Sequence, residues 1–225
     1  MKPAVLHWSS GKDSAFALRR LREQGEMEVK ALLCTVSEEY GRVAIHGVRR
    51  ELLHAQAHAL DLPLLEVPLP NPCSNEEYEG RMKAALERLG AAGITDHVFG
   101  DFMLEDIRNY REGLLARLGL EAHFPLWGAS SPALARDIVL GGIRAHVVVV
   151  DPQRLPRELS GQAFDKSFLA ALPEEVDPCG ERGEFHTLVS ACPDFSAPLS
   201  LRRGETLERD GLLYTDFLLQ ESVAS

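Results

Sequence analysis

The stretch Ala4-Val5-Leu6-His7-Trp8-Ser9-Ser10-Gly11-Lys12-Asp13-Ser14 decides the fold of this chain. It begins as a short apolar strand over residues 4–8 and continues, after a turn of small polar residues, as a predicted helix over 12–24. The small residues of the turn let backbone N–H groups converge on an anion, and the helix N-terminus adds a partial positive charge. The stretch therefore predicts a phosphate cradle between the first strand and the first helix.

Strand and helix signals keep alternating over the next hundred residues. Further strands are predicted at 29–36, 64–67, 97–99 and 121–124, and helices at 48–59, after the capping box 74–77, and from 101 to 118. This alternation is typical of an α/β fold with a parallel, doubly wound sheet and helices on both faces. Because ligands bind beyond the carboxyl ends of such strands, residues 9–14, 35–46 and 100–106 are expected at one edge.

The regular alternation of strand and helix signals ends at Pro125. A helix capped by Ser131 and ended by Gly141-Gly142, a strand at 145–150, a helix at 164–172 and an extended stretch at 185–191 follow. Asp210-Gly211 then predicts a hairpin turn. We expect two domains: an α/β domain over 1–125 that carries the predicted phosphate cradle, and a smaller α+β domain over 126–225.

Composition and charge exclude several classes of protein. The 225 residues include 24 Lys and Arg against 34 Asp and Glu, a net charge of −10 that disfavours nucleic acid as a partner. No apolar run approaches the roughly 20 residues that span a bilayer, and no signal peptide precedes the first strand, so we expect a cytoplasmic protein without a membrane partner. The four cysteines form no C-x-x-C pair, which argues against a structural zinc site.

The turn at 9–14 differs from two better-known phosphate loops. A Walker A loop would need glycine at position 6 and Ser or Thr at position 13, where this chain has Leu6 and Asp13. No G-x-G-x-x-G fingerprint occurs either. The alternative is a plain polar turn capped by Asp13 or Ser14, which six consecutive cradle-type residues make less favourable.

A second dense polar segment runs from 177 to 187. Gly180 and Gly183 allow it to bend, and Glu181 and Glu184 are hard oxygen ligands for Mg²⁺ or acceptors for an amine. His186 is of the residue type that titrates near neutral pH and acts as acid or base. The alternative is a solvated acidic turn before a strand.

Both segments resemble motifs of known enzymes. The loop 9–14 resembles the S-G-G-x-D-S/T loop of the PP-loop ATP pyrophosphatases, with Ser10 in place of the usual second glycine. The segment 180–187 resembles the G-E-x-G-E-[FY]-H/E-T stretch of the diphthine–ammonia ligase family within that group. Shorter similarities follow in the family's order at Ile45-His46-Gly47, Val98-Phe99-Gly100-Asp101 and Pro125-Leu126-Trp127. The chain is closer to the compact prokaryotic form of the family.

The resemblance implies an ATP-dependent amidation with ATP and Mg²⁺, in which residues 1–125 form the PP-loop ATP-binding domain and residues 126–225 form a substrate domain. In the family's reaction the carboxylate of diphthine, a modified histidine of translation elongation factor 2, is adenylated, pyrophosphate leaves, and ammonia displaces AMP. Expected partners are ATP, a carboxylate on a protein or small molecule, and ammonia or an amine; a homodimer stays open. Taking residues and resemblance together, we expect catalytic roles for Lys12, Glu181, Glu184 and His186; ATP contacts from Ser9, Ser10, Gly11, Lys12, Asp13, Ser14, Thr35, Gly100 and Asp101; substrate contacts from His46, Tyr110, Arg111, Gly180, Gly183 and Thr187; and Mg²⁺ ligands in Asp13 and Asp101.

Two departures leave the second substrate open. Arg108-Asn109-Tyr110-Arg111-Glu112 keeps the tyrosine and arginine of the family's Y-Q-R-x-R stretch in another register, and Gly161-Gln162 replaces a Gly-Arg. The alternatives are a PP-loop enzyme that modifies tRNA and a non-catalytic module that binds adenine nucleotides. The net charge and the absence of C-x-x-C count against the tRNA enzyme.

Overall fold

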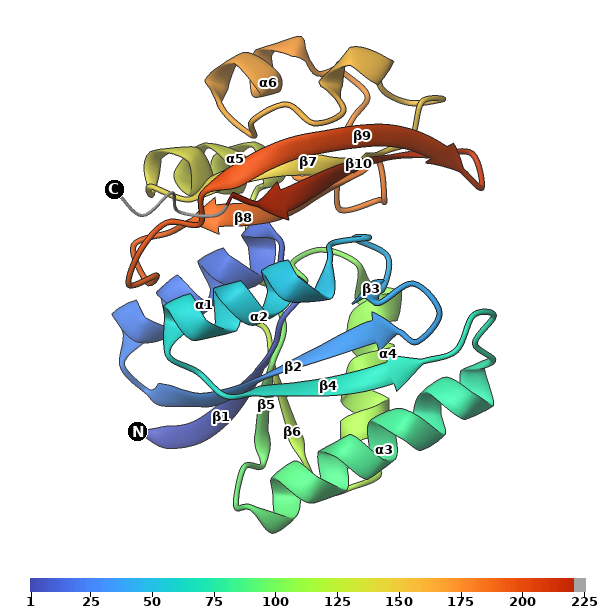
Figure 1. Cartoon of the computed structure of the whole chain (residues 1–225). Coiled ribbons are helices and arrows are strands. Elements are labelled where there is room, and N and C mark those ends of the chain that lie inside the picture. Colours follow the sequence, from blue (N-terminus) through green and yellow to red (C-terminus); the bar gives the residue numbers. More distant parts are fainter. Residues whose placement is uncertain (221–225) are drawn as a thin grey trace, which may run out of the picture.

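The computed structural model describes residues 1–220, which form two β-sheets stacked one above the other (Figure 1). The first sheet holds β1 (Lys2–His7), β2 (Met27–Ser37), β3 (Arg42–Val43), β4 (Leu64–Leu69), β5 (Asp96–Val98) and β6 (Glu121–His123). Its order is β3-β2-β1-β5-β6, and β4 pairs with β2. Every neighbouring pair is parallel except β2 with the two-residue β3, which confirms the predicted parallel sheet.

Helices cover both faces of this sheet. Successive residues of a strand point to opposite sides, and in β1 the residues of both sides are apolar, so each face needs cover. Ala4 and Leu6 of β1 pack in the core that α1 (Lys12–Gln24) and α2 (Arg50–Leu60) cover. Val5 packs in a second core, under α3 (Asn75–Ala91) and α4 (Glu105–Ala116). The predicted capping box starts α3, where the Ser74 side chain accepts a hydrogen bond from the Glu77 backbone N–H at 3.2 Å. The doubly wound arrangement is therefore confirmed.

The second sheet is antiparallel. It consists of β7 (Arg144–Val150), β8 (Phe185–Ala191), β9 (Leu201–Arg209) and β10 (Leu212–Leu219) in the order β8-β7-β10-β9. The β9–β10 turn lies at Asp210-Gly211 as predicted, with φ of 53° and 80°, the positive values that a tight hairpin turn requires.

The remaining helices differ slightly from the predicted bounds. The helix α5 (Ser131–Leu140) includes Ser131, and Ser130 takes the cap position that we predicted for Ser131. The helix α6 (Lys166–Ala171) begins later than predicted because the Asp165 side chain accepts hydrogen bonds from the backbone N–H groups of Ser167 and Phe168. A short 3-10 helix, η1 (Arg157–Leu159), was not predicted.

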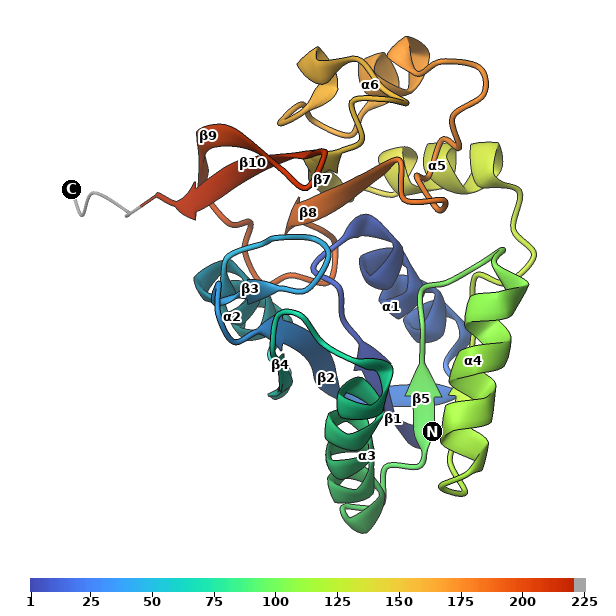
Figure 2. The same cartoon turned by 90° about the vertical axis from the view of Figure 1, so that its right-hand side faces the viewer.

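The two sheets enclose a shared layer of helices. The second sheet lies over α1 and α2, which separate it from the first sheet (Figures 1 and 2). One continuous hydrophobic cluster runs from Ala4 of β1 through Leu18 of α1 and Leu53 of α2 to Val149 of β7 and Phe217 of β10. The domain boundary predicted near residue 125 falls between the strands of the two sheets. Because the hydrophobic cluster crosses this boundary, the division into two domains stays a prediction. Residues 221–225 of the predicted second domain lie outside the described residues.

Within residues 1–220, none of the helices has both the length and the apolar character needed to cross a bilayer.

Candidate active site

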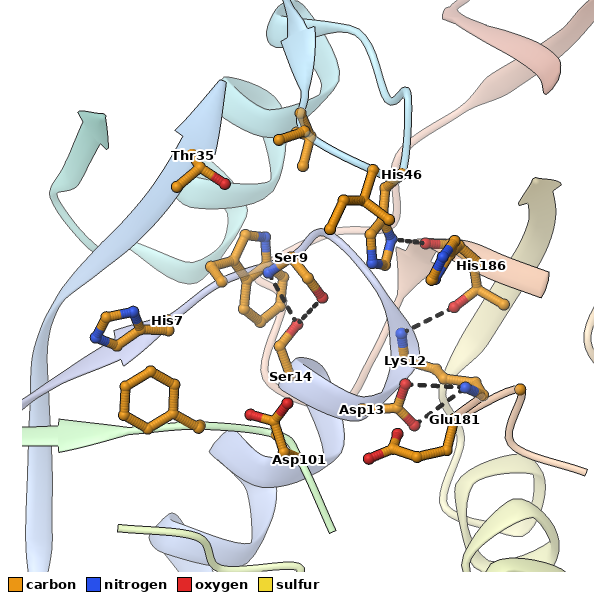
Figure 3. A pocket seen from close by; sticks show the side chains of 18 of the residues that line it. His7, Ser9, Lys12, Asp13, Ser14, Thr35, His46, Asp101, Glu181 and His186 are labelled. Atoms are coloured by element: carbon orange, nitrogen blue, oxygen red, sulfur yellow. Dashed lines mark hydrogen bonds and ion pairs between the residues drawn. The ribbon is translucent and has the colours of Figure 1, made fainter. Parts of the chain in front are cut away.

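The loop between β1 and α1 faces a cavity of about 450 Å³ at the carboxyl edge of the first sheet (Figure 3). The segment 179–187, which leads into β8 of the second sheet, closes the opposite side. The structure therefore brings the two predicted motifs to one cavity. Of the predicted residues, those that line it are Ser9, Lys12, Asp13, Ser14, Thr35, His46, Gly100, Asp101, Arg111, Gly180, Glu181, His186 and Thr187.

Serine hydroxyls of the loop gather at the N-terminus of α1. The Ser9 and Ser14 hydroxyl oxygens are 3.2 Å apart, and the Gly11 backbone N–H donates to the Ser9 hydroxyl at 3.3 Å. The Ser14 hydroxyl donates to the Gly11 carbonyl at 3.0 Å. Both side chains reach the cavity, where hydroxyls beside a helix N-terminus suit a phosphate.

Ser10 lies behind the cavity and holds a backbone conformation that favours glycine. Its φ is 68°, it is fully buried, and its hydroxyl has no hydrogen-bond partner within the described chain. The conformation is fixed from outside the loop, because the Ser10 carbonyl accepts from the Gln56 side chain at 3.1 Å and from the Val189 backbone N–H at 2.9 Å. Serine thus occupies the geometry for which the related motif uses glycine.

Two glycines permit close approach of other segments to the loop. A Cβ on Gly11 would lie 2.8 Å from Cε1 of His46, so glycine here lets the histidine reach the loop. A Cβ on Gly100 would lie 3.0 Å from the Asp13 carbonyl carbon and from the Ser14 backbone nitrogen. These contacts bring the end of β5 and the segment after β3 against the cradle.

Lys12 connects the cradle to the second segment. Its ammonium donates to both carboxylate oxygens of Asp13, at 2.9 and 3.0 Å, and to the Cys179 carbonyl at 2.5 Å. It also lies 5.3 Å and 5.4 Å from the ring centres of Phe164 and Phe185. Burial alone would lower the pKa of Lys12, but attraction to Asp13 outweighs it and raises the pKa, so the buried side chain is charged.

Three carboxylates, those of Asp13, Asp101 and Glu181, face this part of the cavity (Figure 3). Burial, and after it repulsion from Asp13, raises the pKa of Glu181 to about 8, although its carboxylate accepts from the Phe102 backbone N–H at 3.2 Å. Burial also raises the pKa of Asp13 against the opposing attraction of Lys12. Asp101 is paired with Arg111 at 2.9 Å. Carboxylate oxygens of this kind suit Mg²⁺.

The tightest group of potential metal ligands lies elsewhere. Within residues 1–220, ligand atoms of three such side chains come within 4.8 Å of one another at Asp96, Glu121 and His123. Asp96 begins β5, Glu121 and His123 are the first and last residues of the short β6, and none of the three lines the cavity. The assignment of Asp13 and Asp101 as Mg²⁺ ligands therefore stays a prediction.

Two histidines form the wall opposite the carboxylates. The His46 ring nitrogen Nδ1 lies 3.1 Å from the Thr187 carbonyl, and the rings of His46 and His186 are 4.6 Å apart. Burial lowers the pKa of His46 to about 4 and that of His186 well below its ordinary value. Both rings are therefore neutral at pH 7, whereas the residue type alone predicted a titration near neutrality for His186. With Nδ1 donating to Thr187, the Nε2 of His46 is an acceptor.

Several predicted residues do not line the cavity. Tyr110 is 43% exposed, and its hydroxyl donates to Glu79 at 3.4 Å. Glu184 is fully buried, where it accepts from the Arg154 guanidinium at 3.0 Å and from the Arg182 backbone N–H at 2.9 Å. Gly183, between Arg182 and Glu184, has a positive φ of 81° that makes this turn possible. Glu184 thus braces the segment that carries Glu181 and does not reach the cavity.

Other residues at the site were missed by sequence reasoning. His7, Tyr78, Met82 and Phe99 add an aromatic and apolar wall, and the buried Gln56 holds the loop from behind. Gln56 had a usable signal, since it lies four residues from both Leu52 and Leu60 on the buried face of α2. The residues of the apolar wall had none, because they come from three separate segments of the chain: β1, α3 and the end of β5.

The fold and the site define an α/β protein with a loop of small polar residues between its first strand and first helix, and a second sheet that closes the cavity. Residues 1–122 match the sequence model described as the diphthamide synthase N-terminal domain. Because that match covers more than half of the chain, the protein belongs to the diphthamide synthase family.

Two relatives carry the same name. A diphthine–ammonia ligase of Schizosaccharomyces pombe is 30% identical over 220 residues, which cover 89% of this chain and 36% of the relative. A diphthine–ammonia ligase of Danio rerio is 25% identical over 220 residues, which cover 88% of this chain and 86% of the relative. Among solved structures, a "predicted subunit of tRNA methyltransferase" from Methanocaldococcus jannaschii has a TM-score of 0.44 and 14% identity over 85% of this chain and 98% of that one.

Proposed function

We propose that this chain is an ATP-dependent ligase that cleaves ATP to AMP and pyrophosphate, adenylates a carboxylate and transfers ammonia or an amine to it. The observation that carries the proposal is the shared cavity. The cradle at 9–14 and the segment at 180–187 both line it. They are joined by the hydrogen bond from the Lys12 backbone N–H to the Thr187 hydroxyl, two residues that lie 175 positions apart in the sequence. Membership of the diphthamide synthase family and the names of the two relatives support the same reaction.

The first step is attack of a carboxylate oxygen on the α-phosphorus of ATP. The bond from that phosphorus to the bridging oxygen breaks, and pyrophosphate leaves with the electron pair. Ser9, Ser14 and the N-terminus of α1 stabilise the charge that develops on it, and Lys12 adds a nearby positive charge. When bound beside these phosphates, Mg²⁺ would neutralise part of their charge, and Asp13 and Asp101 are the residues that would hold it.

In the second step, ammonia or an amine attacks the acyl carbon, and AMP leaves with the electrons of the carbon–oxygen bond. The nucleophile loses one proton, which passes to Nε2 of the neutral His46 or, above a pH of about 8, to the ionised Glu181 carboxylate. Glu184 is assigned here to positioning, because it holds the backbone on either side of Glu181. Residues 1–125 would bind ATP, and residues 126–225 would contribute the walls that face the acceptor.

The proposed acceptor is diphthine, as the relatives' names suggest. In the family's reaction this diphthine is a residue of translation elongation factor 2. We propose the cytoplasm as the compartment, because that protein and ATP are both found there. Tyr110 and Gly183 are not needed as substrate contacts in this scheme, since neither lines the cavity.

The test is turnover of the full chain with ATP, Mg²⁺, ammonium and diphthine-bearing elongation factor 2. AMP and pyrophosphate are expected in equal amounts, together with one amide per acceptor. Lys12→Met should lower the rate at least about a hundredfold, because it removes a charge beside the leaving group. Lys30→Met is the matched control and should leave the rate unchanged, because Lys30 is an exposed lysine that, among residues 1–220, forms its ion pair with Glu28 on the same strand.

Formation of ADP and phosphate in place of AMP and pyrophosphate would overturn the proposal. Calorimetric binding of ATP and Mg²⁺ without any AMP formation would favour the alternative of a non-catalytic adenine-nucleotide module.

A further inference from the structure

A second cavity, of about 280 Å³, adjoins the first. The two cavities share a wall made by Val43, Ala44, Ile45 and Leu69. The outer side of the second cavity is formed by residues near the end of β4 and by the tip of the β9–β10 hairpin. A molecule that reacts in the first cavity and extends past this wall would therefore place its next part in the second.

Arg209 is the distinctive side chain of the second cavity. The central carbon of its guanidinium lies 4.3 Å from the ring centre of Tyr40 and 5.0 Å from that of Tyr214. Tyr40 is itself held, because its hydroxyl accepts from the Asn71 side-chain amide at 3.2 Å. A guanidinium that packs its faces on aromatic rings keeps its N–H groups at the edge, where they bind a carboxylate in two-pronged geometry.

The charge of Arg209 is largely unused within the described chain. Among residues 1–220, the carboxylate that comes within salt-bridge distance of it is that of Asp210, at 4.0 Å and 89% exposed. The other arginine of the cavity, Arg42, is engaged: it donates to Asp216 at 2.9 Å and to the Gly47 carbonyl at 2.8 Å. Arg209 thus stands as a pre-positioned anion-binding group in a protein of net charge −10.

The rim of the cavity favours a polypeptide over a small molecule. Tyr40 is 40% exposed, Arg209 is 41% exposed, and Ile45, on the shared wall, is 73% exposed. An open rim of aromatic, apolar and arginine side chains is typical of protein-binding surfaces. RNA would also offer anions, but its phosphate chain would be repelled by the acidic remainder of the protein.

We propose that the second cavity binds an acidic side chain of the polypeptide whose reacting carboxylate lies in the first cavity, and that Arg209 is the residue that recognises it. The proposal rests on the proposed function, because it assigns the second cavity to the acceptor of that reaction. Binding at Arg209 would then orient the acceptor without taking part in ATP cleavage.

The kinetic experiment compares Arg209→Gln with Arg202→Gln, using diphthine-bearing elongation factor 2 and ATP as substrates. Arg202 is a matched control, since it is an exposed arginine on the same strand and lines neither cavity. For Arg209→Gln we expect a KM for the acceptor raised about tenfold, the loss of one charge-assisted hydrogen bond, with the KM for ATP and kcat within about twofold. Arg209→Lys, which keeps the charge and loses the planar fork, should fall in between. An unchanged acceptor KM in an active Arg209→Gln enzyme would overturn the subsite and leave the proposed function intact.

A binding experiment gives a decision that does not depend on turnover. Hexaglutamate is titrated into the wild type and both variants, and bulk tRNA is titrated in parallel. The proposal expects hexaglutamate affinity to fall in Arg209→Gln and to be unchanged in Arg202→Gln, whether or not the chain is an active ligase. Equal affinity of all three proteins for hexaglutamate would overturn it, as would tRNA binding that depends on Arg209.

Discussion

Glu181 is a side chain of the cavity whose pKa the fold raises to about 8. It lies in the cavity beside Asp13 and Asp101, and the Lys12 ammonium that could balance these charges is already engaged by Asp13 and the Cys179 carbonyl. Burial and this surplus of negative charge raise its pKa from 4.5 to about 8. In the unfolded chain the same carboxyl ionises at its ordinary pKa. The folded protein therefore holds a proton on Glu181 that the unfolded chain releases between pH 4.5 and about 8.

This linkage predicts a stability loss on going from pH 5 to pH 8. In that range the folded state binds more protons than the unfolded state, so the free energy of unfolding falls as pH rises. Glu181→Gln cannot titrate, so we expect its free energy of unfolding, taken relative to that of the wild type, to rise by about 3 kcal/mol between pH 5 and pH 8. Urea unfolding at both pH values measures this difference. Glu175→Gln, which removes an exposed carboxylate shortly before the segment 177–187, should show no such rise. A parallel pH dependence of the wild type and Glu181→Gln would contradict the assignment.

At the scale of single residues, the sequence indicated which side chains share the cavity where they are contiguous along the chain, and it failed where they come from separate segments. The six residues at 9–14 could be interpreted as a cradle because their neighbours along the chain are also their neighbours in space. Glu181 and Glu184 are three residues apart, yet only Glu181 reaches the cavity, because the turn at Gly183 directs Glu184 to Arg154. The neutral state of His46 and His186 depends on burial, which residue types do not reveal.

Among the elements, the end of β5 and the first turn of α1 set the position of the cradle. Gly100, directly after β5 and Phe99, passes so close to α1 that a Cβ would meet the Asp13 carbonyl carbon and the Ser14 backbone nitrogen at 3.0 Å. Neither neighbour is a flexible side-chain end, so the two elements would have to separate. Glycine at this position therefore fixes the spacing between strand and helix.

Gly100→Ala should lower the free energy of unfolding by about 1–3 kcal/mol, the usual range for overpacking, and weaken ATP binding by shifting the loop. Thermal unfolding and calorimetry with ATP and Mg²⁺ measure the two effects. Gly113→Ala is the control: it lies within α4 with no atom within 4 Å of the added Cβ, so it should be neutral or stabilise by up to about 1 kcal/mol. Equal effects of the two substitutions would show that the close approach of β5 to α1 does not matter.

The ends of helices and strands could be predicted from the sequence where a local residue signal marks them. The helix α1 and the β9–β10 turn agree with the prediction, because a glycine stop and an Asp-Gly turn mark them in the sequence. The strand β3 was missed because two residues cannot establish a period, and it exists only through pairing with Val36 and Ser37 of β2. Pairing of that kind is decided by tertiary contacts.

At the scale of the whole molecule, the site exists only because the two sheets are held in one orientation. The shared hydrophobic cluster supplies most of the contact, but apolar packing alone is not directional. Directional hydrogen bonds between the two sheets come from Gln56 of α2, whose side chain is fully buried. Its side-chain oxygen accepts from the Trp8 indole N–H at 2.9 Å, and its amide donates to the carbonyls of Ser10 at 3.1 Å and Val189 at 2.7 Å. One side chain thus links the cradle to β8 of the second sheet.

Gln56→Leu keeps the size of this side chain and removes all three hydrogen bonds. The Trp8 indole N–H and the Val189 carbonyl would then lose their Gln56 partner in a buried place, so we expect the free energy of unfolding to fall by about 3 kcal/mol. The Ser10 carbonyl would keep its bond from the Val189 backbone, and its looser restraint should let the strained loop relax and weaken ATP binding. Gln153→Leu, at an exposed position, is the matched control and should change neither quantity. If Gln56→Leu unfolds within about 0.5 kcal/mol of the wild type, the coupling of cradle and second sheet must come from the apolar cluster and from the hydrogen bonds that Ser10 and Lys12 make with β8.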